Sequence, residues 1–146
     1  LSPQENQIWR YVRRRDKYGA AEAYAVNGNF REVVDFAIDG SLYALKKSGE
    51  IFKFYAGEAE DFVINKEPIT ALSSPTKVFT DLDLSQIYIL EPSKKRVLVF
   101  NKDIKTGNAM YNSQYIFDFD IRDMVVEKMS GKMYLLSDSK IYEAGM

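Results

Sequence analysis

The stretch Leu42-Tyr43-Ala44-Leu45 sets the architecture of this chain, because the sequence repeats it twice with small changes. The later copies are Ile87-Tyr88-Ile89-Leu90 and Met133-Tyr134-Leu135-Leu136, so the three tyrosines are separated by 45 and 46 residues. A fixed period of about 40–50 residues, built from short strands, is typical of the blades of a β-propeller. The sequence therefore predicts an all-β fold of about three repeats.

Apolar runs on both sides of each copy complete a set of short strands. A polar turn and a second apolar run follow each copy, and the turns are Ser48-Gly49, Lys94-Lys95 and Ser139-Lys140. Runs rich in β-branched and aromatic residues that are split by turn formers predict β-hairpins. Each complete repeat should form a four-stranded antiparallel sheet, with strands at 32–38, 41–46, 50–55 and 59–64, and at 76–81, 86–91, 96–101 and 110–117. Asp39-Gly40 suits a type I′ turn.

Residues 1–146 are expected to form one partial propeller domain. Its parts are the back half of a blade at 1–31, full blades at 32–65 and 76–117, and three strands of a further blade at 121–146. Closed propellers need about four to eight blades, so about three repeats cannot close a ring. We expect either half of a six-bladed propeller within a larger protein, or two copies that associate as a homodimer through their open blade faces.

The repeat at residues 76–117, which contains the second copy, resembles the blades of NHL-type propellers. Those blades carry a strand of the form Ile-Tyr-Val-X-Asp, a polar turn, then Arg-Ile-X-Val-Phe and a turn that contains glycine. Residues 87–91, 96–100 and 102–107 follow this pattern, with Glu91 in place of the aspartate, whereas residues 42–54 follow it without the arginine. The resemblance implies an NHL-like propeller of the kind found in bacterial multi-domain proteins. It covers essentially the whole chain and specifies a blade more than a biochemical role.

The composition argues against catalysis. The chain contains no histidine and no cysteine, which removes the commonest metal ligand, the usual general base near neutral pH and any thiolate. Lyases that resemble NHL propellers use histidine-bound metal, so that activity does not carry over to this chain. The net charge of −1 gives no general attraction to nucleic acid or to an anionic membrane. We therefore expect no enzymatic activity, no cofactor and no metal.

Three groups of acidic residues permit two functional alternatives, which we weigh against a structural role. Glu58, Glu60 and Asp61, and the pair Asp81 and Asp83, permit a carboxylate-dependent hydrolase in the propeller channel if two carboxyl groups meet about 5–10 Å apart. Asp118, Asp120 and Asp123 could offer oxygen ligands to a cation. Their spacing does not match a calcium loop and no glycine is placed for the sharp turn, so we expect an inter-blade connection there.

Basic residues recur in equivalent turns of neighbouring repeats and form the candidate binding site. Lys46 and Lys47 follow the first copy of the repeated stretch, and Lys94, Lys95 and Arg96 follow the second. Equivalent turns lie on one rim of a propeller, so these side chains should be neighbours. Lysine also protects strand edges and increases solubility, which is the structural alternative.

A second basic group lies near the start of the chain. Arg13-Arg14-Arg15, with Arg10, Trp9 and Tyr11, could bind a single-stranded nucleic acid through phosphate contacts and stacking. We favour a solvated turn whose aromatic residues face the core, since the chain as a whole is not basic.

The function that these observations favour is a non-catalytic module for protein interaction or ligand sensing. A protein partner or a second copy of the chain is expected, nucleic acid is disfavoured, and no membrane contact is expected from this segment. The hydrolase, and the single-stranded RNA binding that NHL relatives show, remain as alternatives. The compartment is left open between the cytoplasm and the soluble part of a membrane-anchored protein.

Overall fold

The computed structural model describes residues 1–25, 27–65 and 70–146, and the described chain is all-β. Two short 3-10 helices, η1 (Pro3–Glu5) and η2 (Pro92–Lys94), are the helical segments in these ranges. Neither is long and apolar enough to cross a membrane. The scarcity of helix agrees with the sequence, in which apolar residues never keep a helical spacing over a useful length.

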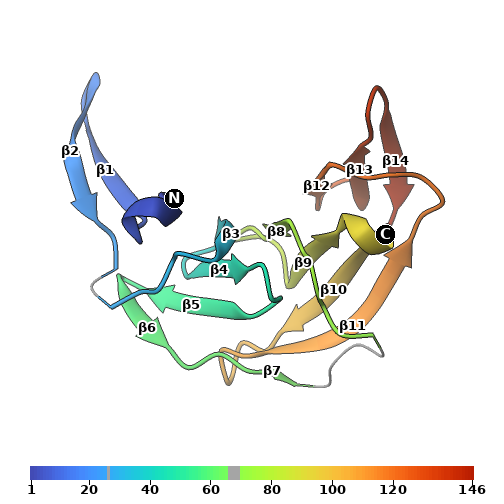
Figure 1. The fold of residues 1–146 in the computed structure, drawn as a ribbon, viewed down its shortest axis with the longest axis horizontal. Helices are drawn as coiled ribbons and strands as arrows, with labels where there is room; N and C mark the ends of the chain where they lie inside the picture. Colours follow the sequence, from blue (N-terminus) through green and yellow to red (C-terminus); the bar gives the residue numbers. More distant parts are fainter. Residues whose placement is uncertain (26, 66–69) are drawn as a thin grey trace.

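The strands form four sheets, which we name by their order along the chain (Figure 1). The N-terminal hairpin consists of β1 (Trp9–Arg14) and β2 (Lys17–Ala23). The second sheet consists of β3 (Val33–Ile38), β4 (Leu42–Lys46), β5 (Ile51–Tyr55) and β6 (Glu58–Glu60). The third sheet consists of β7 (Ile64–Asn65), β8 (Lys77–Phe79), β9 (Gln86–Glu91), β10 (Arg96–Lys102) and β11 (Ala109–Ile116). The last sheet consists of β12 (Asp123–Glu127), β13 (Lys132–Leu136) and β14 (Ile141–Gly145).

The four sheets follow one another along an arc, with the N-terminal hairpin and the last sheet at its two ends (Figure 1). The edge strands β3, β8 and β12 of successive sheets are neighbours. The Val78 amide donates to the Asp35 carboxylate at 2.9 Å, and Lys77 forms an ion pair with Asp123, so polar contacts join β3 to β8 and β8 to β12. Burial raises the pKa of Asp35. The several-sheet, all-β architecture is therefore established, whereas its description as propeller blades stays a prediction.

Most strands lie where the sequence places them, and two local features differ. The predicted strand 59–64 is two strands: β6 pairs with β5, whereas β7 pairs in parallel with β11 of the next sheet. The chain thus crosses between sheets here, held by the Val63 amide, which donates to Asn108 Oδ1 at 3.0 Å. The predicted type I′ turn at Asp39-Gly40 is wrong, because Gly40 has a positive φ of 108° and Asp39 does not. The turn instead closes through the Ser41 amide, which donates to the Asp39 carboxylate.

The inner strands of the second and third sheets, such as β4 and β9, bury apolar side chains on both faces. In β4, Leu42 and Ala44 belong to a cluster with the N-terminal segment, whereas Tyr43 and Leu45 pack with the third sheet. Residues alternate between the two faces of a strand, so one strand contributes to two cores. This explains why the repeated stretch is a continuous apolar run.

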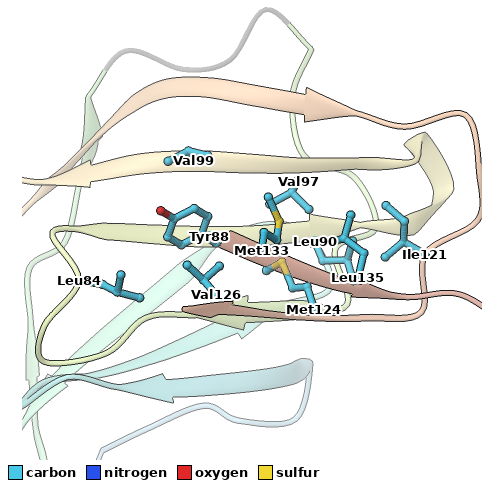
Figure 2. Close-up of a cluster of buried hydrophobic side chains, with 10 residues drawn as sticks. All are labelled: Leu84, Tyr88, Leu90, Val97, Val99, Ile121, Met124, Val126, Met133 and Leu135. Carbon is cyan, nitrogen blue, oxygen red and sulfur yellow. The ribbon is translucent and has the colours of Figure 1, made fainter. Parts of the chain in front are cut away.

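The third and last sheets enclose the largest of these cores (Figure 2). The third sheet contributes Tyr88, Leu90, Val97 and Val99, and the last sheet contributes Met124, Val126, Met133 and Leu135. All eight side chains are buried. Burying a large apolar side chain stabilises a folded protein by about 1.5–3 kcal/mol. Because these side chains are buried between two sheets, we expect contact between sheets to be the main source of stability in this fold.

Candidate interaction surface

One end of the sheets carries a group of loops with exposed apolar side chains, which we call the loop face. Its loops are residues 39–41, 81–85, 103–108 and 128–131, and they connect strands of three different sheets. Leu82, Ile104 and Met129 are 77%, 94% and 98% exposed at or near the tips of these loops. Single exposed apolar residues are ordinary, but three that surround the same depression are typical of an interaction surface.

Two adjoining cavities lie between these loop tips. The first, of about 420 Å³, is lined by Leu82 and Ile104 together with polar side chains. The second, of about 480 Å³, is lined by Met129 and shares Leu84 and Lys128 with the first. Together they form one groove that crosses from the second sheet to the last sheet.

Two lysines form the polar floor of this groove. Lys102 Nζ lies 2.6 Å from Asp39 Oδ2 and 3.0 Å from Thr80 Oγ1, and Lys53 Nζ lies 2.8 Å from Glu60 Oε2. Lys53 Nζ also donates to the Gly107 carbonyl of the third sheet at 3.3 Å. Both ammonium groups are largely buried, and each connects the second sheet to the third. Their role is to fix the position of the loops.

Tyr43 completes the floor of the first cavity. Burial raises the pKa of its phenol, and the nearby Asp39 carboxylate raises it further. The hydroxyl therefore keeps its proton at any physiological pH and acts as a hydrogen-bond donor rather than as a base. This tyrosine comes from the first copy of the repeated stretch, so the same residue builds the core and the groove.

The loop that presents Ile104 is held by its own hydrogen bonds. Asp103 accepts from the Lys105 amide at 2.9 Å and from the Thr106 hydroxyl at 2.8 Å, and these bonds, that of Thr106 first, lower the pKa of Asp103. The Gly107 amide donates to the Asp103 carbonyl at 2.8 Å, with a φ of 72° at Gly107 that favours glycine. The exposed side chain thus projects from an ordered turn.

The five basic residues of the sequence-based site lie in the turns at the opposite end of the same strands. Lys46 forms an ion pair with Glu50 and lies 4.0 Å above the Phe52 ring, and Lys95 forms an ion pair with Asp120. Lys47 is exposed. Lys46 and Lys47 belong to the second sheet, and Lys94, Lys95 and Arg96 belong to the third. None of these five residues lines the groove. Their role in partner binding stays a prediction.

Arg96 forms a buried ion pair with Glu91, and Lys94 contacts the same carboxylate. The Arg96 guanidinium lies 2.6 Å from Glu91 Oε2 and also donates to the carbonyls of Thr70 and Ala71 at 2.9 and 3.2 Å. Lys94 lies 3.1 Å from Glu91 Oε1. Both members of the Arg96–Glu91 pair are buried, so the guanidinium is committed to holding the chain before β8.

Glu91 has a strongly shifted pKa as a result. Burial raises it, but hydrogen bonds from the Ser73 amide, Arg96, Lys94 and the Ser73 hydroxyl outweigh burial and lower the pKa to about 2. The carboxylate is therefore ionised at any physiological pH. Glu91 and Arg96, which occupy the Asp and Arg positions of the NHL pattern, thus form an ion pair that fixes the chain segment before β8.

The N-terminal hairpin differs from expectation at its aromatic residues. Trp9 is 36% exposed and Tyr11 is 54% exposed, so the expectation that these two aromatic side chains face the core is wrong. Tyr18 of β2 is also exposed, at 69%. The reason is that the residues packed against the second sheet, among them Ile8, Ala25 and Phe30, lie outside the two strands. Arg10 pairs with Glu22 at 2.7 Å, and the remaining arginines of β1 are exposed.

Several of the acidic residues considered in the sequence analysis lie in loops between strands or form ion pairs. Asp118 and Asp120 lie between β11 and β12, and Asp123 begins β12. No group of three potential metal-ligating side chains occurs among the residues that the structure describes. Glu60 pairs with Lys53, whereas Asp81 and Asp83 lie on the loop face.

The sequence did not predict the loop face, because Leu82, Ile104 and Met129 do not belong to any periodic pattern. Each is one apolar residue among polar neighbours, in the runs Asp-Leu-Asp, Asp-Ile-Lys and Lys-Met-Ser. A large apolar residue in the middle of a polar turn is the signal that could have indicated them.

Comparison with known proteins supports the fold and leaves function open. No family model matches the chain, and no curated protein matches its sequence. Among solved structures, a protein of Bacteroides fragilis NCTC 9343 described as exported is similar, with a TM-score of 0.60 and 11% identity. The match covers 97% of this chain and 40% of that protein, so the chain spans less than half the length of its structural relative. At this identity the likeness shows a shared fold alone.

Proposed function

We propose that the chain is part of an NHL-like β-propeller and that it binds a protein partner through the loop face without catalysing a reaction. The propeller description is supported by the arc of successive sheets and by strands that bury both faces. The likeness covers two-fifths of a longer exported protein, which agrees with a place within a larger protein.

The exposure of Leu82, Ile104 and Met129 around one groove carries this proposal. Interfaces combine a few large apolar anchors with polar surroundings that fix orientation, and the lysines and carboxylates of the groove supply the polar part. The Lys53 and Lys102 contacts hold the loops of the second and third sheets in place relative to each other. A partner would therefore meet a largely preformed surface, which lowers the entropic cost of association.

The chemistry of the groove favours binding over catalysis. Each buried lysine is paired with a carboxylate, and Tyr43 holds its proton. The alternative of a carboxylate hydrolase would need a carboxyl group with a raised pKa beside a second, ionised one. Asp103, which lines the groove, has instead a lowered pKa.

Photo-crosslinking tests the proposal directly. A photoreactive amino acid at position 104 or 129 should yield a discrete adduct with one protein in a lysate of the source organism. The same amino acid at Ile116, which is 69% exposed on an outer strand, is the matched control and should yield none. Equal crosslinking from all three positions, or none from positions 104 and 129, would contradict the proposal.

A second candidate function rests on the N-terminal hairpin. Exposed Tyr11 and Tyr18, together with the arginines of β1 and its turn, combine stacking surfaces with positive charge, as single-stranded nucleic acid binders do. A fluorescence titration with single-stranded RNA at two salt concentrations tests it. Binding that weakens as salt increases and that disappears in Tyr11→Ala would support it, and an absence of salt-dependent binding would remove it.

A further inference from the structure

We infer that the groove of the loop face binds a basic segment of the partner protein, in which arginine or lysine residues lie beside large apolar ones. This inference rests on the function proposed above, and it adds the chemistry of the partner that the same groove would bind. It follows from the charges around the three exposed apolar side chains of the loop face.

Ion pairs within the chain neutralise the lysines on the floor of the groove but not the carboxylates at its rim. Lys102 pairs with Asp39, and Lys53 pairs with Glu60. Five further charged residues line the groove and form no ion pair within the part of the chain that the structure describes: Asp81, Asp83, Asp103, Glu127 and Lys128. Four carboxylates and one ammonium group give this rim a net charge of −3, whereas the whole chain has a net charge of −1. Lys105 belongs to one of the loops but does not line the groove.

Each exposed apolar side chain of the loop face has a carboxylate close to it in the sequence. Leu82 lies between two aspartates, and Ile104 directly follows Asp103. Met129 lies two residues after Glu127. A partner that covers these apolar side chains also covers the neighbouring carboxylates, so an acidic partner would be repelled and a neutral one would remove water from them without a compensating charge. A basic partner compensates both effects and is attracted to the groove over a longer range.

Hydrogen bonds orient two of these carboxylates and leave acceptor positions free. Asp103 accepts from the Lys105 amide and from the Thr106 hydroxyl, with one bond at each carboxylate oxygen. The Ser130 hydroxyl donates to Glu127 Oε2 at 2.6 Å. A carboxylate has about four acceptor sites, so both groups can accept further bonds from a guanidinium or an ammonium group.

The carboxylates are distributed along the groove. Asp103 lines the first cavity, and Asp81 and Glu127 line the second. Asp83 and Lys128 line both cavities. This distribution suits an extended segment with several positive charges along its length, and Lys128 is the one rim residue whose charge opposes it.

Selection of peptides on the intact chain tests this inference. A random peptide library displayed on phage is selected against the wild type, and peptides that also bind Ile104→Ser/Met129→Ser are discarded. The remaining peptides should be rich in arginine or lysine beside large apolar residues, and their affinity should fall as salt increases.

Charge variants then test the selected peptides as synthetic probes. Asp81→Asn/Asp83→Asn should weaken their binding about three- to tenfold, and Lys128→Gln should strengthen it about two- to threefold. Asp16→Asn/Glu58→Gln removes two exposed carboxylates outside the groove and is the matched control, with affinity close to that of the wild type.

The outcomes separate this inference from the proposed function. Selected peptides without basic residues, an affinity that does not depend on salt, or equal effects of Asp81→Asn/Asp83→Asn and the control would overturn the inference and leave the loop face an interaction surface. A selection in which no peptide depends on Ile104 and Met129 would overturn both. The salt dependence is measured on the wild type, so it decides the question even if a charge variant fails to fold.

Discussion

The third sheet and the last sheet have the same local sequence pattern and very different surroundings. In the third sheet the face toward the last sheet contains Leu90 and Val97, neither of which is measurably exposed. The equivalent residues of the last sheet are Leu136 and Ile141, which are 42% and 72% exposed. The pattern of a strand is thus local, whereas its burial depends on whether a neighbouring sheet covers it.

The turns of the two sheets differ in the same way. Glu91 ends β9 and Arg96 begins β10, and their buried ion pair holds the segment before β8. At the equivalent positions between β13 and β14 stand Ser137 and Lys140, joined by a main-chain hydrogen bond. The third sheet is therefore held on both faces and at its turn, and the last sheet on one face.

Breaking the buried ion pair should give the largest effect. Arg96→Met leaves the Glu91 carboxylate buried without its main partner and removes the bonds to Thr70 and Ala71, so we expect a loss of about 3–5 kcal/mol in the free energy of unfolding. Urea denaturation measures it. The double variant Glu91→Leu/Arg96→Met should recover much of the loss, because no unpaired charge remains, and a double variant as unstable as the single one would contradict this explanation.

Truncating equivalent leucines in the third and last sheets should give the next largest difference in stability. Leu90→Ala removes a fully buried side chain and should cost about 2–5 kcal/mol through lost burial and a cavity. Leu136→Ala, at the equivalent position, should cost less than about 1 kcal/mol, because the side chain is already half in solvent. Equal losses in urea denaturation would mean that the face of the last sheet is covered in solution.

The pH dependence of stability should show the contribution of the ionised Glu91 carboxylate. Its pKa of about 2 in the folded chain lies below its ordinary value of 4.5, so the unfolded chain binds more protons between these values. The stabilising contribution is complete above about pH 5 and is lost as the pH falls toward 2. The difference in the free energy of unfolding between the wild type and Glu91→Gln should therefore become smaller as the pH falls from about 5 to 2. Denaturation measured at several pH values tests this. A difference that does not change with pH would exclude the ionised Glu91 carboxylate as its source.

Charge reversal in equivalent turns should give the smallest and most selective effect. Lys94→Glu puts a second negative charge beside Glu91 and should lower the melting temperature, whereas Lys47→Glu changes an exposed residue and should shift stability by about 0.5 kcal/mol or less. Thermal unfolding followed by circular dichroism measures both. A comparable loss from Lys47→Glu would show that Lys47 acts in folding rather than in binding.

The sequence predicted the strands well because their residues are apolar at fixed distances from Tyr43, Tyr88 and Tyr134. Its errors arise where tertiary contacts decide the outcome. The strand at 59–64 divides because residues 64 and 65 find a partner in β11, and Arg96 is buried because Glu91 lies opposite it in the hairpin. The loop face was not predicted, since a single apolar residue in a turn carries no period.

Hydrogen exchange of the whole chain, followed residue by residue, tests most directly the claim that neighbouring sheets determine stability. The account predicts the slowest exchange in β9 and β10, where amides such as Ile89 and Leu98 are enclosed by sheets on both sides and opening requires global unfolding. It predicts fast exchange at Ile141, Glu143 and Gly145 of β14. Uniform protection across the third and last sheets, or slower exchange in β14 than in β10, would contradict it.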